Sequence, residues 1–205
     1  MDQHRIDGNA SPERKQNKNT LTETVLLSLH DLVHLLAGIL LVLLLLFRIV
    51  IVSGPSMNTT LVDGDFLLLL SNIFYTDPQQ GDIVVASKDS FKNGEPIIKR
   101  VIATEGQNVD IDFSAGVVYV DGIALEETYT LTPTNLEEGN RFPMVVDEGC
   151  IFVMGDNRNM SKDSRNPEIG LIDKREVLGK AIFLLFPGTN GGLEQPQYNR
   201  IGAIS

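Results

Sequence analysis

The chain has 205 residues and a formal net charge of −10, with 17 Lys and Arg against 27 Asp and Glu. This length suits one anchored domain with a small insertion, and the negative charge argues against binding nucleic acid by neutralising its phosphates. The single cysteine, Cys150, excludes an internal disulfide. All three histidines precede residue 35, so the rest of the chain must do any acid–base chemistry without imidazole.

Residues 1–31 are expected to form a cytoplasmic segment and residues 32–52 a transmembrane anchor. Roughly 20 apolar residues cross a bilayer as a helix, and Asp, Glu, Lys and Arg are represented in this run only by Arg48, whose long stem can reach the interface. A buried core helix would show a polar stripe, which residues 40–46 lack. A cleaved signal peptide would usually have a shorter apolar region and a small-residue cleavage site. We therefore predict a retained single-pass anchor.

Basic residues near the span set its orientation. Four Lys and Arg residues precede the span, whereas Lys88 is the first basic residue after it. The amino terminus is therefore expected in the cytoplasm and the chain from residue 53 outside. The protein is predicted to lie in the cell membrane, in contact with the lipid bilayer.

The outer part alternates short apolar runs with turn residues and has almost no helical period. This pattern predicts a mainly β fold, with a folded antiparallel sheet or barrel-like domain after the helix. Strands are expected at residues 66–70, 82–86, 97–103, 117–120, 150–154 and 180–186.

A change of composition divides the outer part. Residues 105–143 are acidic and poor in large apolar side chains, which is typical of a small inserted sub-domain. Residues 53–104 and 144–187 are predicted to form the main β domain. The glycine-rich end, residues 188–205, is predicted to be a flexible tail.

Ser56 follows the apolar span in the sequence Ser53-Gly54-Pro55-Ser56-Met57. Gly54 permits close backbone approach and Pro55 stiffens the turn, so Ser56 would be presented rigidly near the bilayer surface. A serine nucleophile without histidine needs another base, and lysine is the usual substitute. The alternative is an exit turn from the membrane whose serines only bond water.

Lys99 interrupts an apolar strand, residues 96–103. It shares a strand face with Ile97 and Val101, and burial there would favour the neutral amine and lower the lysine pKa. A general base works near the operating pH, and burial brings lysine into that range. Arg100 points to the opposite face and suits a buried carboxylate. The alternative for Lys99 is an edge-strand lysine with its head in water.

A polar loop, residues 155–165, follows an apolar strand. Its many hydrogen-bonding side chains suit a loop that orients neighbours or pairs charges, although a solvated loop has the same composition. Cys150 is expected to be a buried inert thiol, because a catalytic thiolate would need a base. No metal site is predicted, since histidine is missing outside and the acidic pairs lack calcium-loop spacing.

These features occur in the order seen in type I signal peptidases: apolar span, Ser56-Met57, the strand with Lys99-Arg100, and Gly-Asp-Asn-Arg-x-x-Ser-x-Asp-Ser-Arg from residue 155. The chain resembles the short single-span bacterial form of that family over residues 32–187. The resemblance implies a serine endopeptidase with a Ser–Lys dyad and no cofactor. Its partners would be secretory precursors, whose signal peptides it would remove at the outer face of the membrane.

The resemblance also assigns roles. Ser56 matches the nucleophile, Lys99 the general base, and Ser161 a hydroxyl that helps hold the lysine amine. The implied structural ion pairs are Asp163 with Arg165 and Asp156 with Arg100. Shallow apolar pockets would select small residues, and the predicted walls are Val52, Met57 and Ile98.

Two positions depart from the family pattern. Thr59 stands where proline is usual, and Gly54 where some members supply an oxyanion-hole hydroxyl. Backbone donors, including the Ser56 N–H, are therefore expected to hold the oxyanion. Two other functions stay open: a Ser–Lys self-cleaving regulator, usually joined to a DNA-binding module, and a non-enzymatic anchored module that binds through its acidic surface.

Overall fold

The structure is a computed structural model that describes residues 13–189 and 195–204. The chain forms two compact units that meet in sequence between Leu44 and Leu45, and each is described by itself. The first part of the predicted cytoplasmic segment, residues 1–12, lies outside the described residues.

One long helix, α1 (Glu13–Leu46), begins earlier and ends earlier than the predicted span. Its residues Glu23–Leu46 have a mean hydropathy of 2.4, so they are long and apolar enough to cross a membrane. Residues 47–52 of the predicted span are not helical, because Phe47–Ile51 form a strand, β1. Three consecutive β-branched residues at 49–51 favour extended backbone, and β1 pairs along its whole length with β2 (Phe66–Ser71).

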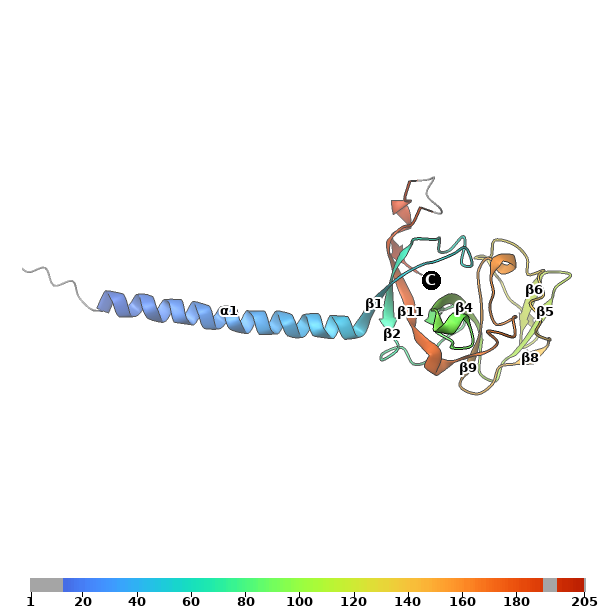
Figure 1. The fold of residues 1–205 in the computed structure, drawn as a ribbon, viewed down its shortest axis with the longest axis horizontal. Helices are drawn as coiled ribbons and strands as arrows, with labels where there is room; N and C mark the ends of the chain where they lie inside the picture. The colour runs from blue at the N-terminus through green and yellow to red at the C-terminus, as the bar shows by residue number, and fades with distance from the viewer. Residues whose placement is uncertain (1–12, 190–194, 205) are drawn as a thin grey trace, which may run out of the picture. The chain divides into compact units, whose positions relative to one another are not determined.

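The second unit is built on an eight-stranded antiparallel sheet (Figure 1). The strand order is β1-β2-β11-β3-β4-β9-β10, with β12 paired to β11. The remaining strands are β3 (Ile83–Ala86), β4 (Ile97–Thr104), β9 (Cys150–Met154), β10 (Ile172–Asp173), β11 (Val177–Phe186) and β12 (Gly202–Ala203). The predicted mainly β, antiparallel fold is confirmed.

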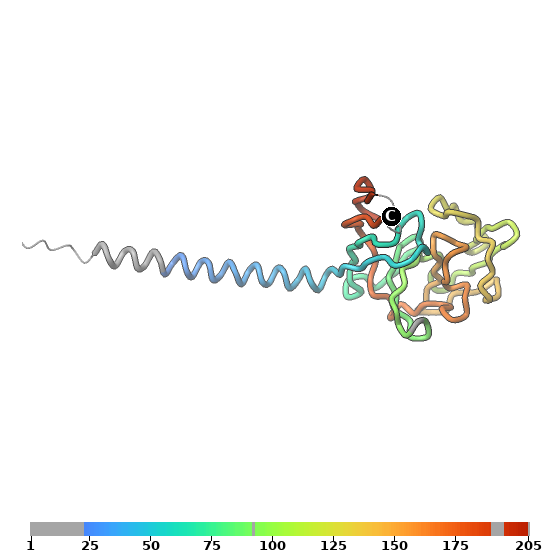
Figure 2. Tube along the Cα trace, turned by 45° about the horizontal axis from the view of Figure 1, so that its top comes forward, coloured from blue at the N-terminus to red at the C-terminus, as the bar shows by residue number. Residues whose placement is uncertain are grey.

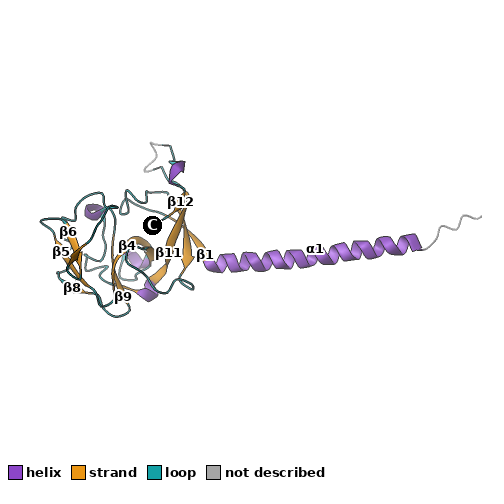
Figure 3. Ribbon diagram, turned by 180° about the vertical axis from the view of Figure 1, so that it is seen from behind, coloured by secondary structure: helices purple, strands orange, loops and turns teal. Residues whose placement is uncertain are grey.

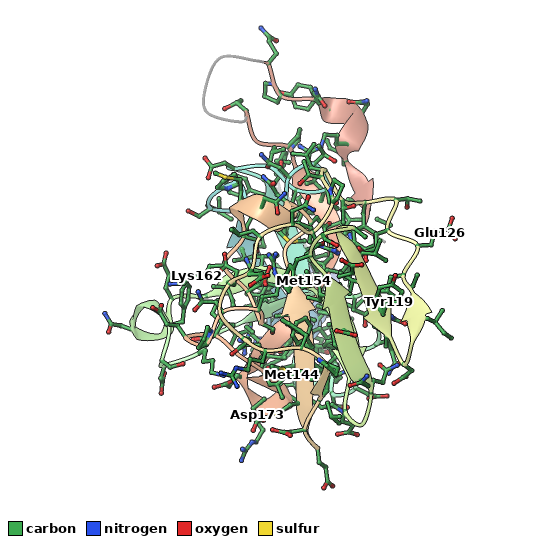
Figure 4. The ribbon with its side chains drawn as sticks, turned by 90° about the vertical axis from the view of Figure 1, so that its right-hand side faces the viewer. Tyr119, Glu126, Met144, Met154, Lys162 and Asp173 are labelled. Carbon is green, nitrogen blue, oxygen red and sulfur yellow. The ribbon has the colours of Figure 1, made fainter. Side chains whose placement is uncertain are left out.

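A second, four-stranded sheet has the order β7-β6-β5-β8. Its strands are β5 (Asn108–Asp112), β6 (Val117–Val120), β7 (Ile123–Ala124) and β8 (Met144–Val145). In Figure 4 Tyr119 marks β6 and Met154 marks the end of β9 in the main sheet. This sheet occupies almost the same residues as the predicted insertion, extended by β8. It buries Val109 and Val118 against Phe152 and Met154 of β9, so a shared apolar core attaches it to the main sheet.

Short 3-10 turns complete the fold: η1 (Lys92–Gly94), η2 (Arg158–Met160), η3 (Lys174–Glu176) and η4 (Tyr198–Arg200). Figure 3 shows β12 beside β11. The described residues 195–204 therefore differ from the predicted flexible tail, since β12 extends the sheet and Ile204 packs against its core. Residues 190–194 and 205 of that tail lie outside the described residues.

Strand β4 lies inside the sheet between β3 and β9. Its residues from Lys99 to Ala103 are buried without alternation, because apolar clusters cover both faces. Ile83 and Val85 lie in one cluster with Met57, whereas Val101 lies in another. Any polar side chain on the middle of β4 must therefore find its partners inside the protein.

Candidate active site

Ser56 lies in the tight turn that follows β1. Gly54 has φ of 87°, a left-handed conformation that glycine adopts at little cost, and its N–H donates to the Asp63 carboxylate at 2.8 Å. The Asn58 N–H donates to the Pro55 carbonyl at 3.1 Å and closes the turn. Met57, directly after Ser56, is 1% exposed and anchors the turn in the core.

Lys99 reaches Ser56 from the middle of β4. Its side chain is only 4% exposed. Lys99 Nζ lies 2.9 Å from Ser56 Oγ and donates to the Ile98 carbonyl at 2.9 Å. Burial of a lysine side chain disfavours the charged ammonium. A hydroxyl and a desolvated amine at hydrogen-bond distance are able to exchange a proton.

The loop after β9 holds the nucleophile turn through Asn157. The Asn157 backbone N–H donates to the Ser56 carbonyl at 3.0 Å, and its side-chain amide donates to the Pro55 carbonyl at 3.1 Å. A second link joins the Thr60 hydroxyl to Asp156 Oδ2 at 2.5 Å. Sequence reasoning assigned no role to Asn157, although it lies in the polar loop 155–165, nor to Thr60, which lies four residues after Ser56.

Arg100 and Asp156 form a buried bidentate ion pair. Arg100 Nε and NH2 lie 2.9 and 2.8 Å from the two Asp156 oxygens, and both side chains are at most 3% exposed. The Tyr129 ring covers the guanidinium, with Arg100 Cζ 4.0 Å from the ring centre. Burial, followed by the nearby Glu127 charge, raises the pKa of Tyr129 to about 12, so this cover stays neutral.

Asp163 and Arg165 form a second buried pair. Arg165 Nε and NH2 both lie 2.8 Å from the Asp163 carboxylate, and neither side chain is exposed. Asp163 also accepts the Gly155 N–H at 3.0 Å. The arginine donates in turn to the carbonyls of Arg158 and Ser161 at 2.6 and 3.2 Å. This pair therefore fixes both ends of the loop beside Ser56.

Replacing Asp163 with asparagine is expected to lower the free energy of unfolding by about 3–5 kcal/mol, because it leaves the Arg165 charge buried without a counter-charge. Thermal unfolding in detergent, followed by circular dichroism, measures the change. Asp173→Asn is the matched control, since its partner Arg175 is 90% exposed and exposed pairs contribute little. Equal destabilisation by both variants would contradict the structural role of the Asp163 pair.

The inserted sub-domain supplies a carboxylate that the sequence did not reveal. Arg158 donates to Glu127 through both terminal nitrogens and to the Thr134 hydroxyl at 2.8 Å. It also donates to the Gly155 carbonyl at 3.1 Å. Glu126, labelled in Figure 4, is exposed beside it. The insertion contains many acidic residues, and only the structure shows that Glu127 is the one that turns inward to Arg158.

Ser161 does not bond to Lys99 in the structure. Its hydroxyl is buried, and Ser161 Oγ has no hydrogen-bond partner among the described residues. The implied hydrogen bond to the lysine amine is therefore absent. Ser161 nevertheless lies close to the nucleophile turn, because a Cβ built on Gly155 would meet Ser161 Oγ at 2.2 Å and the Ser56 carbonyl oxygen at 2.4 Å.

A cleft of about 490 Å³ opens at Ser56 and Lys99. The three residues predicted as walls, Val52, Met57 and Ile98, all line it, although Met57 and Val52 are almost fully buried. Ends of β1 and β4 form its sides. Among the lining residues that sequence reasoning missed, Phe91, Glu95 and Lys162 come from loops.

Comparison with known proteins assigns the family. The family described as signal peptidase, peptidase S26, matches residues 24–186. The chain is 36% identical to a probable signal peptidase I-1 of Synechocystis, over 77% of this chain and 82% of the relative. It is 37% identical to a signal peptidase I of Bacillus licheniformis, over 72% and 81%. The chain therefore belongs to the signal peptidase family, peptidase S26, and is a peptidase.

A solved structure is also similar. The crystal structure of a signal peptidase I from Enterococcus faecalis is 29% identical in sequence, with a TM-score of 0.41. The match covers 51% of this chain and 96% of that one.

Proposed function

We propose that this peptidase is a membrane-anchored serine endopeptidase that removes signal peptides from secretory precursors at the outer face of the cell membrane. Ser56 is the nucleophile and Lys99 the general base. The observation that carries this proposal is the 2.9 Å separation of Ser56 Oγ and the buried Lys99 Nζ. The apolar segment Glu23–Leu46 is the anchor, with its amino-terminal end in the cytoplasm.

The reaction begins when neutral Lys99 takes the proton of Ser56 and Oγ attacks the carbonyl carbon of a small residue. Backbone donors, the Ser56 N–H among them, stabilise the oxyanion. Lys99 then returns the proton to the leaving amine, and the mature amino terminus departs. A water molecule, deprotonated by Lys99, hydrolyses the acyl-enzyme and releases the signal peptide.

Ser161 is proposed to assist the charged form of Lys99. Its buried hydroxyl has no partner among the described residues in the resting geometry, so rotation of the hydroxyl toward the ammonium would supply a hydrogen bond when the proton arrives. Asp163, Arg165, Asp156 and Arg100 act by holding the surrounding loop. Val52 and Ile98 form shallow apolar walls that admit small side chains.

Cleavage of one secretory precursor tests the proposal. Full-length protein in detergent is incubated with a precursor that ends its signal peptide in an Ala-x-Ala-like site, and the new amino terminus is sequenced. Wild type is expected to cut once after the small residue, and Ser56→Ala to be inactive. Ser53→Ala, three residues upstream, is the control and retains activity. Undiminished cutting by Ser56→Ala would overturn the assignment of the nucleophile.

The rate of cleavage is expected to rise with pH. The ammonium form of Lys99 has no lone pair to accept the Ser56 proton, so only the deprotonated fraction of the enzyme reacts. Initial rates measured from pH 5 to 10 at saturating peptide substrate give the profile. A rate that is flat over this range would exclude lysine as the base.

A further inference from the structure

The C-terminal strap, residues 195–204, returns to the domain after the family-matched segment has ended at residue 186. Within it, β12 pairs with β11 through Ala203 opposite Phe183 and Gly202 opposite Leu184. The Ile204 N–H also donates to the Ile182 carbonyl at 3.1 Å. Figure 2 shows the strap at the red end of the tube. None of the roles proposed above uses it.

Arg200 of the strap binds a fully buried carboxylate. Its NH2 and NH1 lie 2.6 and 3.0 Å from the two oxygens of Asp65, which is 0% exposed. Asp65 also accepts the N–H groups of Val62 and Gly188 at 2.8 and 2.7 Å. Among the ion pairs of the described residues, Arg200 is the cation that balances this charge.

The same guanidinium holds the segment that carries Ser56. Arg200 NH2 donates to the Thr60 carbonyl at 3.2 Å, while the Thr60 hydroxyl donates to Asp156. Asp156 is the bidentate partner of Arg100, the neighbour of Lys99 in β4. Thr60 is therefore held from two directions, by the strap and by the loop beside the active site.

Apolar contacts follow the same path. Ile204 packs against the core cluster that contains Met57 and Leu61, and the Leu61 N–H donates to the Met57 carbonyl at 2.9 Å. Met57 directly follows Ser56, so the strap supports the nucleophile turn from within the core. Displacements of about 1 Å at a reacting group are able to cost 10²-fold in rate.

We propose that Arg200 is a positioning residue of this peptidase. By holding Asp65 and the Thr60 carbonyl, it fixes the turn in which Ser56 faces Lys99. This inference rests on the proposed function of Ser56 as the nucleophile. Without the guanidinium, the Asp65 carboxylate draws water into the segment 57–65, and Ser56 Oγ spends less time at hydrogen-bond distance from Lys99 Nζ.

The test compares full-length wild type with Arg200→Ala and Arg200→Lys in detergent, on a precursor peptide. Arg200→Ala is expected to lower kcat by about 10-fold and to change KM by less than about two-fold, because orientation is lost and peptide binding is not. Arg200→Lys keeps the charge and should recover part of kcat. Arg175→Ala removes an exposed arginine–aspartate pair and should match wild type.

Amide hydrogen exchange separates positioning from general loss of stability. In Arg200→Ala, exchange is expected to accelerate in residues 57–65, where the Leu61, Val62 and Asp65 N–H groups are bonded locally, while β4 and β9 stay protected. Faster exchange throughout the domain, or an unchanged kcat, would overturn the proposal. If Ser56→Ala still cleaves, the assignment of the nucleophile is wrong. The hydrogen-exchange result for Arg200→Ala does not depend on that assignment.

Discussion

Arginine in place of Lys99 is expected to lower kcat for precursor cleavage by about 10³-fold, within the range for loss of a general base. The guanidinium keeps the positive charge but stays protonated at any working pH, so it is unable to accept the Ser56 proton. Single-turnover cleavage at pH 8 measures the loss and avoids any contribution from product release.

Lys174→Arg is the matched control for this substitution. Lys174 is a partly exposed lysine that pairs with Glu105 and Asp77, so its replacement should leave kcat unchanged. Lys99→Met tests whether the loss comes from the missing base and not from a buried charge, because methionine is a neutral side chain of similar length. If Lys99→Arg retained more than about a tenth of wild-type kcat, its activity would be well above the expected residual activity, and the base would lie elsewhere.

Alanine in place of Gly155 is expected to lower kcat by about 10²-fold. The new Cβ would lie 2.2 Å from Ser161 Oγ and 2.4 Å from the carbonyl oxygen of Ser56. The serine side chain is able to rotate, but the Ser56 carbonyl belongs to the backbone and accepts the Asn157 N–H. Relief therefore requires the nucleophile turn to move away from Lys99.

A second substitution distinguishes the two contacts of Gly155. In Gly155→Ala combined with Ser161→Gly, the clash with the serine side chain is gone while the clash with the Ser56 backbone remains. The double variant should stay impaired, with KM changed less than kcat. Recovery of wild-type kcat in the double variant would show that the clash with Ser161, and not the clash with the Ser56 carbonyl, lowers kcat in Gly155→Ala. Gly38→Ala in α1 controls for glycine loss, since a Cβ there meets nothing and Gly38 does not have a left-handed backbone conformation.

The sequence predicted the fold and the site where the signal was local. Alternating short apolar runs gave five of the expected strands close to their observed bounds, and the residue types around Ser56 and Lys99 indicated the chemistry. The end of the helix was not predictable in this way. Residues 49–51 are apolar and β-branched, and such a run occurs in lipid-facing helices as well as in strands. Only the pairing of β1 with β2 distinguishes them.

Contacts between distant segments account for the rest. Glu127 and Arg158 are 31 residues apart, and nothing in the sequence separates Glu127 from the other acidic residues of the insertion. Arg200 and Asp65 are 135 residues apart, in a region whose glycines indicated a loose tail. The geometry of Ser161 was missed for another reason, because a resemblance assigns a role to a residue but does not determine its rotamer.

Glu126 is exposed, whereas its neighbour Glu127 turns inward to Arg158. This difference has a consequence for where the chain tolerates insertions. Insertions are accommodated where a turn borders open space, and the turn at Gly122, between β6 and β7, meets that condition, because a Cβ added there meets nothing within 4 Å. The stretch 127–134 does not, because Glu127, Tyr129 and Thr134 lie on the two arginines next to the cleft. A tag or an added module is therefore tolerated at residue 122, whereas one inserted a few residues later would silence the enzyme from a distance.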